Sequence, residues 1–378
     1  MNRPVSFPVS FRGPNVLIPC GGKWVGHVVH VREAMAKIAA FRDGRVFVAD
    51  LQPVTPAGCF ADAAFQVPPV RDAAYVPALR ELAIKHAIGL ILPLIDIDVM
   101  ALAPHRSALA EDGVHVVCPS PELAEICFDK RRFHDFARSH HLAVPRVFAA
   151  EELASAAFPL FAKPARGFGS IGAKVCPDRA SSEKSLQERP DLVFEEYLEG
   201  VEFSVDLYVS RSTAPVVSVV RQRDKVVGGE AYQSHTVRRP DVRSLARECA
   251  AALASVGYWG PLNVQIIVGP GGPAIIDVNP RLGSASLLSN AATGGRLVWS
   301  ILYEASGGLC GEVDDDYVVG LSLTRYLGEV YHLEGRAVRV DPPSQVRSAA
   351  LPDCWTRPHF RMTAEDSAAY PATRGAPQ

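Results

Sequence analysis

The first third of the chain alternates short apolar runs with segments of helical periodicity. Apolar runs occupy residues 15–20, 45–50, 89–94 and 114–118, and helical patterns occupy 28–40 and 75–86. Strands that alternate with helices form parallel sheets with crossover connections. We therefore expect an open α/β domain. Ligands of such sheets bind beyond the carboxyl ends of the strands, where five residues fall: Gly21, Gly22, Asp50, Asp96 and Asp98.

A second pattern predicts a β-hairpin at residues 262–279. Two β-rich runs, 262–268 and 273–279, flank the turn-forming cluster 269–272. If Val268 pairs with Ala274, the alternation of strand side chains places Val264, Ile266, Ile276 and Val278 on one face. That face is apolar and suits a core.

The opposite face of this hairpin is polar. In the same register Gln265 lies opposite Asp277 and Asn263 lies opposite Asn279, with Cβ atoms about 5 Å apart. One carboxylate and three amides therefore converge, which suits Mg²⁺ bound together with phosphates. An ordinary hairpin with one solvated face is the alternative. Arg281 favours the first interpretation, since a permanent cation next to the cluster could bind phosphate.

A glycine loop lies within residues 161–174. Gly167, Gly169 and Gly172 have the spacing of a dinucleotide-binding motif, but that motif opens a helix, and here a strand pattern follows. Strand, glycine loop and strand instead suit a flap over a triphosphate, with backbone N–H groups and Ser170 as donors and Lys163 as a point charge. A mobile surface hairpin is the alternative.

Residues 192–207 form a third candidate for nucleotide binding. Two strand patterns flank Glu199 and Gly200, and residues 195–198 have the pattern of a hinge that presents backbone groups to an adenine edge. Glu202 follows at a position suited to ribose hydroxyls, because carboxylates bind vicinal hydroxyls well.

Composition narrows the class of protein. The chain has 378 residues, enough for two or three domains, and 39 Lys and Arg residues against 41 Asp and Glu. This balance predicts no nucleic-acid or membrane partner. Eight dispersed cysteines without a CxxC pair, and no apparent signal peptide, predict a cytoplasmic protein. The pair His27 and His30 and the pair His140 and His141 have spacings that could bind a metal. Neither pair has a third ligand in the sequence, so we expect all four histidines at solvated surface positions.

Together these segments resemble the ATP-grasp superfamily, in particular single-module proteins similar to the large chain of carbamoyl-phosphate synthetase. The resemblance covers nearly the whole chain. Its motifs are Asp129-Lys130 before a helix, Lys163-Pro164 with the glycine loop, the 195–198 hinge with Glu202, and the strand ending at residues 277–281. It implies an ATP-grasp fold of α/β and α+β type, with an N-terminal Rossmann-like pre-ATP-grasp domain.

The resemblance also implies roles for particular residues. Lys130 and Lys163 would contact the ATP phosphates, and Gly169, Ser170 and Gly172 would form the flap. Glu195, Glu196 and Leu198 would hold adenine, with Glu202 on the ribose. Gln265, Asp277 and Asn279 would bind one or two Mg²⁺ ions, or Mn²⁺, and Arg281 would act with Lys163 in catalysis. Many relatives have Glu at the position of Asp277 and an acidic residue at that of Gln265, which puts a second metal site in doubt.

The chemistry implied is activation of a carboxylate by ATP to an acyl phosphate, followed by attack of an amine. We expect an ATP-dependent, ADP-forming carboxylate-amine ligase for amino-acid-like molecules, with small-molecule carboxylate and amine substrates as its partners. A homodimer is compatible with the sequence. A carboxylase or phosphotransferase on the same fold, and a nucleotide-binding regulatory protein without turnover, are the alternatives.

The expected domains are a pre-ATP-grasp domain over 1–120, a small ATP-grasp subdomain over 121–193, a carboxyl-terminal ATP-grasp subdomain over 194–363, and a disordered tail over 364–378. Within the third, residues 291–305 are predicted as a helix and 318–332 as a strand pair. Asp96 and Asp98 could bind a substrate amine or cap the helix that follows. The roles of Arg223, Lys225, Glu230 and His235 stay open at this point.

Overall fold

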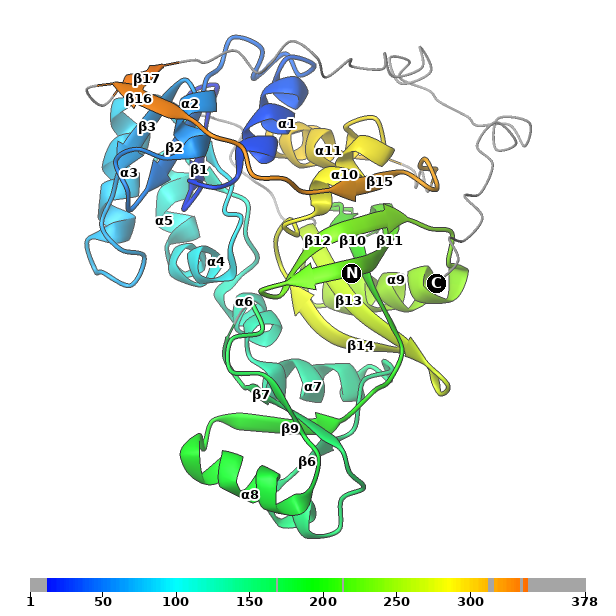
Figure 1. Cartoon of the computed structure of the whole chain (residues 1–378). Helices are drawn as coiled ribbons and strands as arrows, with labels where there is room; N and C mark the ends of the chain where they lie inside the picture. The colour runs from blue at the N-terminus through cyan, green and yellow to red at the C-terminus, as the bar shows by residue number, and fades with distance from the viewer. Residues whose placement is uncertain (1–11, 168, 213, 312–315, 334–335, 339–378) are drawn as a thin grey trace.

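The computed structural model describes residues 12–167, 169–212, 214–311, 316–333 and 336–338. The expected tail at 364–378 lies outside the described residues. Three parts follow one another along the chain: an amino-terminal α/β part, a small α+β part, and a central antiparallel sheet with its helices (Figure 1). The mixture of α/β and α+β predicted from the sequence is therefore confirmed.

The amino-terminal part is built on a parallel sheet of strand order β3-β2-β1-β4-β5. Along β1, Val16 and Ile18 pack on one side of the sheet with helix α1, while Leu17 packs on the other side with helices α3 and α4. Near-continuous apolar strands are typical of a sheet covered on both faces. The elements are β1 (Asn15–Pro19), α1 (Val25–Met35), β2 (Val46–Asp50), α2 (Pro56–Phe60), β3 (Ala63–Gln66), α3 (Tyr75–Lys85), β4 (Ile88–Ile91), α4 (Asp96–Leu102), η1 (Ala103–His105), α5 (Arg106–Glu111) and β5 (His115–Val116).

The small part lies at the bottom of Figure 1, and the chain enters it through two helices. Asp129 caps the second of these helices by accepting hydrogen bonds from the N–H groups of Arg131 and Arg132, as a short carboxylate does at a helix start. An antiparallel sheet of order β6-β9-β7-β8 follows. The elements are α6 (Pro121–Phe128), α7 (Lys130–Ser139), β6 (Val147–Phe148), η2 (Ala150–Ala154), β7 (Leu160–Pro164), β8 (Lys174–Cys176), α8 (Arg179–Glu188) and β9 (Leu192–Glu196).

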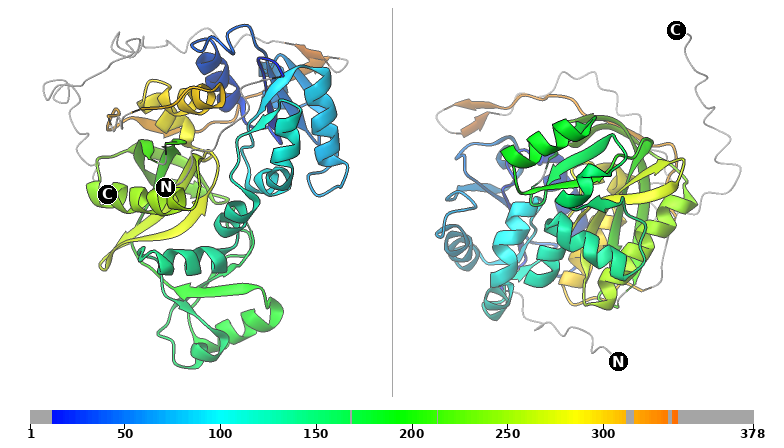
Figure 2. Two further views of the ribbon diagram at one scale, coloured as in Figure 1. Left: turned by 180° about the vertical axis from the view of Figure 1, so that it is seen from behind. Right: turned by 90° about the horizontal axis from the view of Figure 1, so that it is seen from below.

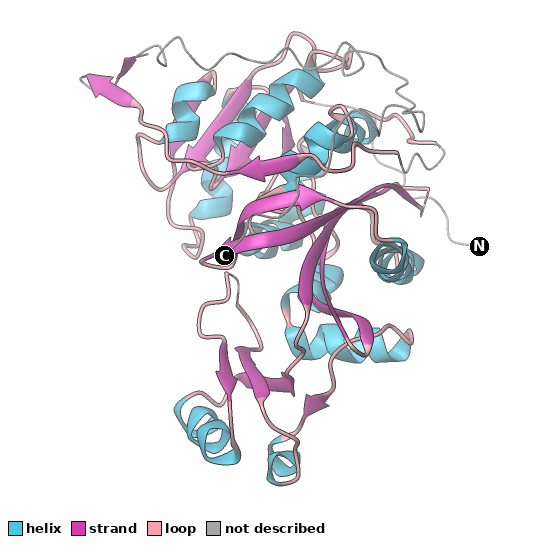
Figure 3. Cartoon of the chain, turned by 45° about the vertical axis from the view of Figure 1, so that its right-hand side comes forward, coloured by secondary structure: helices cyan, strands magenta, loops and turns pink. Residues whose placement is uncertain are grey.

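The central part is an antiparallel sheet of order β14-β13-β10-β11-β12-β15. Helix α9 covers one face, where Phe203, Val205 and Leu207 of β10 alternate inward. Figure 3 shows the long, strongly curved strands of this sheet between the two smaller parts. The elements are β10 (Val201–Val209), β11 (Pro215–Val227), β12 (Glu230–Thr236), α9 (Pro240–Ser255), β13 (Gly260–Gly269), β14 (Gly272–Asn279), α10 (Ser286–Ala292), α11 (Arg296–Ala305) and β15 (Ser322–Thr324).

Helices α10 and α11 join the central part to the amino-terminal sheet. Leu297 and Ile301 of α11 belong to the same apolar core as Val28 of α1 and Val16 of β1. The left view of Figure 2, seen from behind, shows α1 beside these helices. The sequence prediction that His27 lies on a solvated surface is wrong, because this junction buries it to 2% exposure. Its Nε2 atom lies 3.2 Å from Ser286 Oγ of α10.

Two predictions near the carboxyl end are also wrong. The helix expected at 291–305 is interrupted, because Gly294 and Gly295 have φ angles of 63° and 90°, which an α-helix does not allow. The expected strand pair at 318–332 does not form. Strand β15 pairs with β12, whereas β16 (Tyr331–Leu333) pairs with β17 (Arg336–Val338).

Candidate active site

The hairpin of β13 and β14 supplies the polar face predicted from the sequence. Asn263 pairs with Asn279 and Gln265 pairs with Asp277, as predicted. The expected pairing of Val268 with Ala274 is wrong, because the register shifts by one residue directly after Gln265 and Val268 faces Pro273.

Ile276 is the extra residue of this β-bulge. Contrary to prediction, it does not enter the core. Ile275 does so with 1% exposure, while Ile276 lines a cavity on the polar side. The bulge also presents the carbonyl oxygen of Ile276 to Lys163, whose Nζ donates to it at 2.8 Å.

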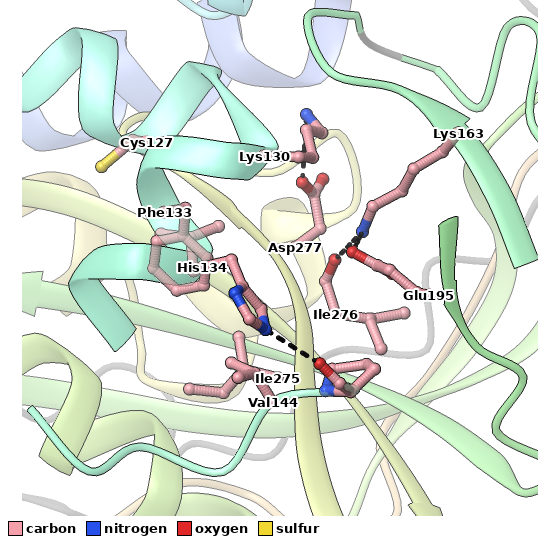
Figure 4. A pocket seen from close by; sticks show the side chains of 12 residues that line it. Cys127, Lys130, Phe133, His134, Val144, Lys163, Glu195, Ile275, Ile276 and Asp277 are labelled. Carbon is pink, nitrogen blue, oxygen red and sulfur yellow. Dashed lines mark hydrogen bonds and ion pairs between the residues drawn. The ribbon is translucent and has the colours of Figure 1, made fainter. Parts of the chain in front are cut away.

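Two lysines reach this hairpin from the small part (Figure 4). Lys130, the first residue of α7, lies 3.3 Å from Asp277 Oδ1 and donates to the carbonyl of Gly167 at 3.0 Å. Lys163 on β7 lies 2.8 Å from Glu195 Oε1. Burial raises the pKa of Asp277, but the two lysines outweigh it and hold the pKa below its ordinary value. Asp277 is therefore an ionised carboxylate between two cations.

The predicted glycine flap is a β-hairpin loop. Strands β7 and β8 pair antiparallel on either side of it, so the loop opens no helix and is not a dinucleotide-binding turn. Gly169 and Gly172 have φ angles of 64° and 81°, which favour glycine. Gly172 lies against the guanidinium of Arg189, where an added Cβ would come within 2.7 Å of Nη1.

A cavity of about 410 Å³ separates the small sheet from the central sheet. The chain crosses from β9 to β10 through the predicted hinge, so this segment forms one side of the cavity. Ten residues predicted for nucleotide, phosphate or metal binding line it: Lys130, Lys163, Gly169, Ser170, Glu195, Glu196, Leu198, Glu202, Gln265 and Asp277.

Two carboxylates of the predicted nucleotide site have partners within the chain. Glu195 is 6% exposed and contacts Lys163, as described above. Glu202 lies 3.2 Å from Nε of Arg223, whose side chain is 5% exposed. Burial raises the pKa of Glu202, and the neighbouring Arg223 limits this rise. Arg223, left open by the sequence, thus belongs to this cavity wall.

A second cavity of about 820 Å³ lies between the carboxyl ends of the parallel strands and the central sheet. Asn279 and Arg281 line it. Its wall also includes Gln265, Asp277 and Arg223, which line the first cavity too. The hairpin therefore stands at the boundary between a nucleotide-sized cavity and a larger neighbour.

Arg281 is held by the amino-terminal part. Its Nε and Nη2 atoms donate to the two carboxylate oxygens of Asp96 at 3.2 and 2.7 Å. Asp96 therefore pairs with an arginine, and among the described contacts it neither caps α4 nor stands free for a substrate amine. Asp98 is fully buried and accepts hydrogen bonds from Tyr75 and Cys20.

A buried cluster beneath the second cavity was missed by the sequence analysis. Asp206 is 1% exposed and accepts from Arg221 Nε at 2.8 Å, Asn263 Nδ2 at 2.6 Å and Ser289 Oγ at 2.6 Å. Arg221 lines the cavity, and its Nη1 atom is buried without a hydrogen-bond partner in the structure. The available signal was the polar alternation of Ser204 and Asp206 within an otherwise apolar strand.

The remaining residues left open lie around the β11–β12 hairpin. Glu230 pairs with Lys23 at 2.5 Å and with Arg325 at 2.9 Å. His235 lies 2.7 Å from Asp224, and the Lys225 ammonium lies over the ring of Tyr232. Of these, Glu230 lines the second cavity.

The tip of this hairpin touches the glycine flap. A Cβ added to Gly229, whose φ is 76°, would lie 2.6 Å from the carbonyl carbon of Gly169. Gly169 and Ser170 line both cavities. Two backbone loops therefore meet where the cavities join.

The predicted metal ligands offer the oxygen donors that Mg²⁺ requires. Hard cations prefer carboxylate and carbonyl oxygens, and Mg²⁺ in nucleotide sites is typically held by one or two carboxylates plus phosphates. Asp277 is ionised, and Gln265 and Asn279 offer amide oxygens beside it. Among the described residues no three His, Cys, Asp or Glu side chains converge on a metal site. The donor set fits one magnesium ion completed by phosphate.

Comparison with known proteins identifies two family profiles in this chain. Residues 127–285 match the ATP-grasp domain, and residues 16–117 match the PylC-like, N-terminal domain. The chain therefore contains an ATP-grasp domain, and enzymes with this domain use ATP together with Mg²⁺. The domain that precedes it is of the PylC-like type.

Relatives are distant and mostly longer. A carbamoyl phosphate synthase large chain of Corynebacterium glutamicum is 23% identical over 264 residues, which is 65% of this chain and 23% of the relative. The 3-methyl-D-ornithine–L-lysine ligase of Methanosarcina mazei is 27% identical over 189 residues, 50% of this chain and 47% of the relative. The chain thus spans less than half of each relative.

A solved structure shares the fold. The biotin carboxylase domain of the Hydrogenobacter thermophilus 2-oxoglutarate carboxylase, crystallised as a dimer with MgADP, ADP and bicarbonate, superposes with a TM-score of 0.68. Sequence identity is 15%, over 83% of this chain and 73% of that one. Within the described residues, no helix is long and apolar enough to cross a membrane.

Proposed function

We propose that the protein is an ATP-dependent carboxylate-amine ligase, which forms an amide or peptide bond between amino-acid-like molecules through an acyl phosphate. The observation that supports this proposal is the shared wall of the two cavities. Asp277, Gln265 and Arg223 face a nucleotide-sized cavity on one side and a larger cavity on the other. A phosphoryl group could pass between the two without leaving the protein.

The first cavity would hold ATP. Lys130 and Lys163 would contact the phosphates, and they already converge on Asp277 and the bulge carbonyl. Backbone and side-chain groups of Glu195, Glu196 and Leu198 would contact adenine, with Glu202 at the ribose. The flap residues Gly169, Ser170 and Gly172 would cover the phosphates and exclude water.

Asp277, Gln265 and Asn279 would hold magnesium. When bound, it would neutralise charge on the phosphate oxygens. Arg281 faces the second cavity with its charge steadied by Asp96, so it would stabilise negative charge on the transferred phosphoryl group.

The reaction would take two steps. A carboxylate oxygen attacks the γ-phosphorus, the bond to the β-phosphate oxygen breaks, and ADP leaves with that electron pair. A neutral amine then attacks the acyl carbon, inorganic phosphate leaves, and the nitrogen loses a proton as the amide forms. Catalysis of this kind needs positioning and charge stabilisation more than a protein nucleophile.

The test is ADP release with Mg²⁺-ATP across amino acids, other carboxylates and bicarbonate, each with and without amine acceptors. Stimulation that needs both a carboxylate and an amine supports the ligase. Stimulation by bicarbonate would indicate a carboxylase, and stimulation by an acceptor with no amide product a phosphotransferase. Absence of stimulated turnover across the whole panel would leave a regulatory nucleotide-binding protein.

Asp277→Ala tests the site itself. We expect a loss of turnover of at least about 100-fold, because the variant removes the one carboxylate of the proposed metal site. Asp241→Ala is the matched control. It removes an exposed carboxylate that pairs with Arg239, away from both cavities. An Asp277→Ala variant as active as the control would refute the proposal that Asp277 binds magnesium.

We further propose a cytoplasmic location and a homodimer. The seven described cysteines are free thiols, which is compatible with a reducing compartment. Light scattering of the purified chain would test the dimer.

A further inference from the structure

The charges that line the second cavity are almost all paired. Nearly every ionised side chain on its wall has an opposite charge within 4 Å. The pairs are Lys23 with Glu230, Asp96 with Arg281, Arg221 with Asp206, Arg223 with Glu202, and Asp277 with Lys130. Among the described residues of this wall, Asp50 is the exception.

Asp50 is the last residue of β2, at the carboxyl edge of the parallel sheet. Its Oδ2 accepts from the backbone N–H of Gly22 at 2.9 Å, and its Oδ1 accepts from that of Gln52 at 3.2 Å. These bonds fix the orientation of a half-buried carboxylate but supply no full positive charge. Each oxygen can accept a further hydrogen bond.

Gly22 leaves room for this arrangement. A Cβ there would lie 2.7 Å from Asp50 Oδ2, so the loop after β1 approaches the carboxylate as closely as only glycine allows. The result is a rigid acceptor that faces the cavity from the amino-terminal part. Arg281, Asn279 and Asp277 face the same cavity from the central sheet.

We propose that Asp50 binds the ammonium group of the substrate whose carboxylate is activated, so that the substrate is an amino acid. This inference rests on the proposed ligase function. The carboxylate of the amino acid would lie toward Arg281, where phosphoryl transfer takes place. The ammonium would lie toward Asp50 and complete the charge pairing of the wall.

Chemistry separates this role from catalysis. An ammonium group held by a carboxylate has no free electron pair, so it cannot attack the acyl phosphate. The attacking amine therefore belongs to the second substrate. Asp50 is a specificity residue that selects amino acids over simple carboxylates and bicarbonate, because charge-assisted hydrogen bonds are the strong ones.

The experiment compares each amino acid with the carboxylic acid that has hydrogen in place of the α-ammonium group. ADP release is measured with the full chain, Mg²⁺-ATP and an amine acceptor. We expect amino acids to stimulate release and their deaminated counterparts not to. Asp50→Asn should raise KM for the amino acid about tenfold or more, with little change in kcat.

Asp72→Asn is the matched control, because Asp72 also accepts from a backbone N–H two residues ahead, at 2.8 Å, but does not line the cavity. It should leave KM unchanged. Equal stimulation by deaminated acids, or an unchanged KM in Asp50→Asn, would overturn the inference while the ligase proposal stands.

A thermal-shift assay with MgADP and millimolar amino acids separates the two proposals further. If no compound stimulates ADP release, the ligase is refuted, and an amino acid that raises the melting temperature of the wild type but not of Asp50→Asn then supports only the binding of an ammonium group by Asp50. If no amino acid produces a shift, the role of Asp50 is refuted.

Discussion

The pair of Asp96 and Arg281 joins the amino-terminal part to the candidate active site, and its removal gives a sharp test. The side chains are 7% and 16% exposed, and two nitrogens of Arg281 meet the two oxygens of Asp96. Asp96→Ala leaves the arginine buried without its carboxylate. Breaking a buried pair in this way destabilises a protein by about 3–5 kcal/mol, so we expect a loss of this size in urea unfolding.

A double-mutant cycle isolates the interaction from the other effects of each substitution. Asp96→Ala combined with Arg281→Ala should lose less stability than the two single variants together, with a coupling of about 2 kcal/mol. Arg239 and Asp241 provide the control pair, since they have the same two-contact geometry, at 3.0 and 2.7 Å, on the exposed surface. That pair should couple by less than about 1 kcal/mol.

The reasoning fails if the two cycles give the same coupling, or if Asp96→Ala unfolds at the same urea concentration as the wild type. A separate measurement addresses function. Asp96→Asn keeps the shape of the side chain and removes its charge, so the variant should bind Mg²⁺-ATP with unchanged affinity but release ADP more slowly, because Arg281 is no longer held in place.

Three further predictions concern other parts of the molecule. Gly229→Ala should raise KM for ATP several-fold, because its Cβ would collide with Gly169. Gly257 is the control: it also has a positive φ, but a Cβ there meets no atom within 4 Å, so Gly257→Ala should lower stability by about 1 kcal/mol and leave KM unchanged. Equal kinetics in both variants would contradict a role of the Gly229–Gly169 contact in ATP binding. Burial raises the pKa of Asp98 to about 7, so the folded state binds its proton more tightly than the unfolded state and stability should fall between about pH 4 and 7. Asp98→Asn should flatten this decline in thermal melts, and an unchanged slope would refute the assignment. Glu304 is 1% exposed and accepts hydrogen bonds from four groups. Glu304→Leu leaves these donors without their acceptor, so it should lower the free energy of unfolding in urea by about 3 kcal/mol or more. A loss below about 1 kcal/mol would contradict a stabilising role of Glu304.

Features set by neighbouring residues were predictable from the sequence. The parallel sheet followed from apolar runs separated by helical patterns, and the β13–β14 hairpin followed from two strand patterns across a glycine turn. The pairing of Gln265 with Asp277 was derived from a turn register that is wrong, and the bulge at Ile276 restores it. The β7–β8 hairpin was likewise indicated by the strand pattern after the glycine loop. In each case the periodicity of side chains along a few residues carries the information.

Features set by distant contacts were not predictable. The bulge at Ile276 accompanies a bond to Lys163, which is far away in the sequence. His27 was expected on a solvated surface because no third metal ligand accompanied it and His30, yet α10, far away in the sequence, contacts it at a buried junction. Asp206 gave little signal, because a lone acidic residue in a strand indicates nothing until its partners are known.

The contact between Gly229 and Gly169 has a consequence for how such a protein can diverge. A side chain at position 229 would collide with the backbone of the glycine flap, and under the proposed function this loop would serve any substrate equally. Position 229, in the turn between β11 and β12, therefore cannot easily change when the protein adapts to a new substrate. Sequence change in this wall of the cavity has to come from flanking positions such as Glu230, whose side chain lines the cavity.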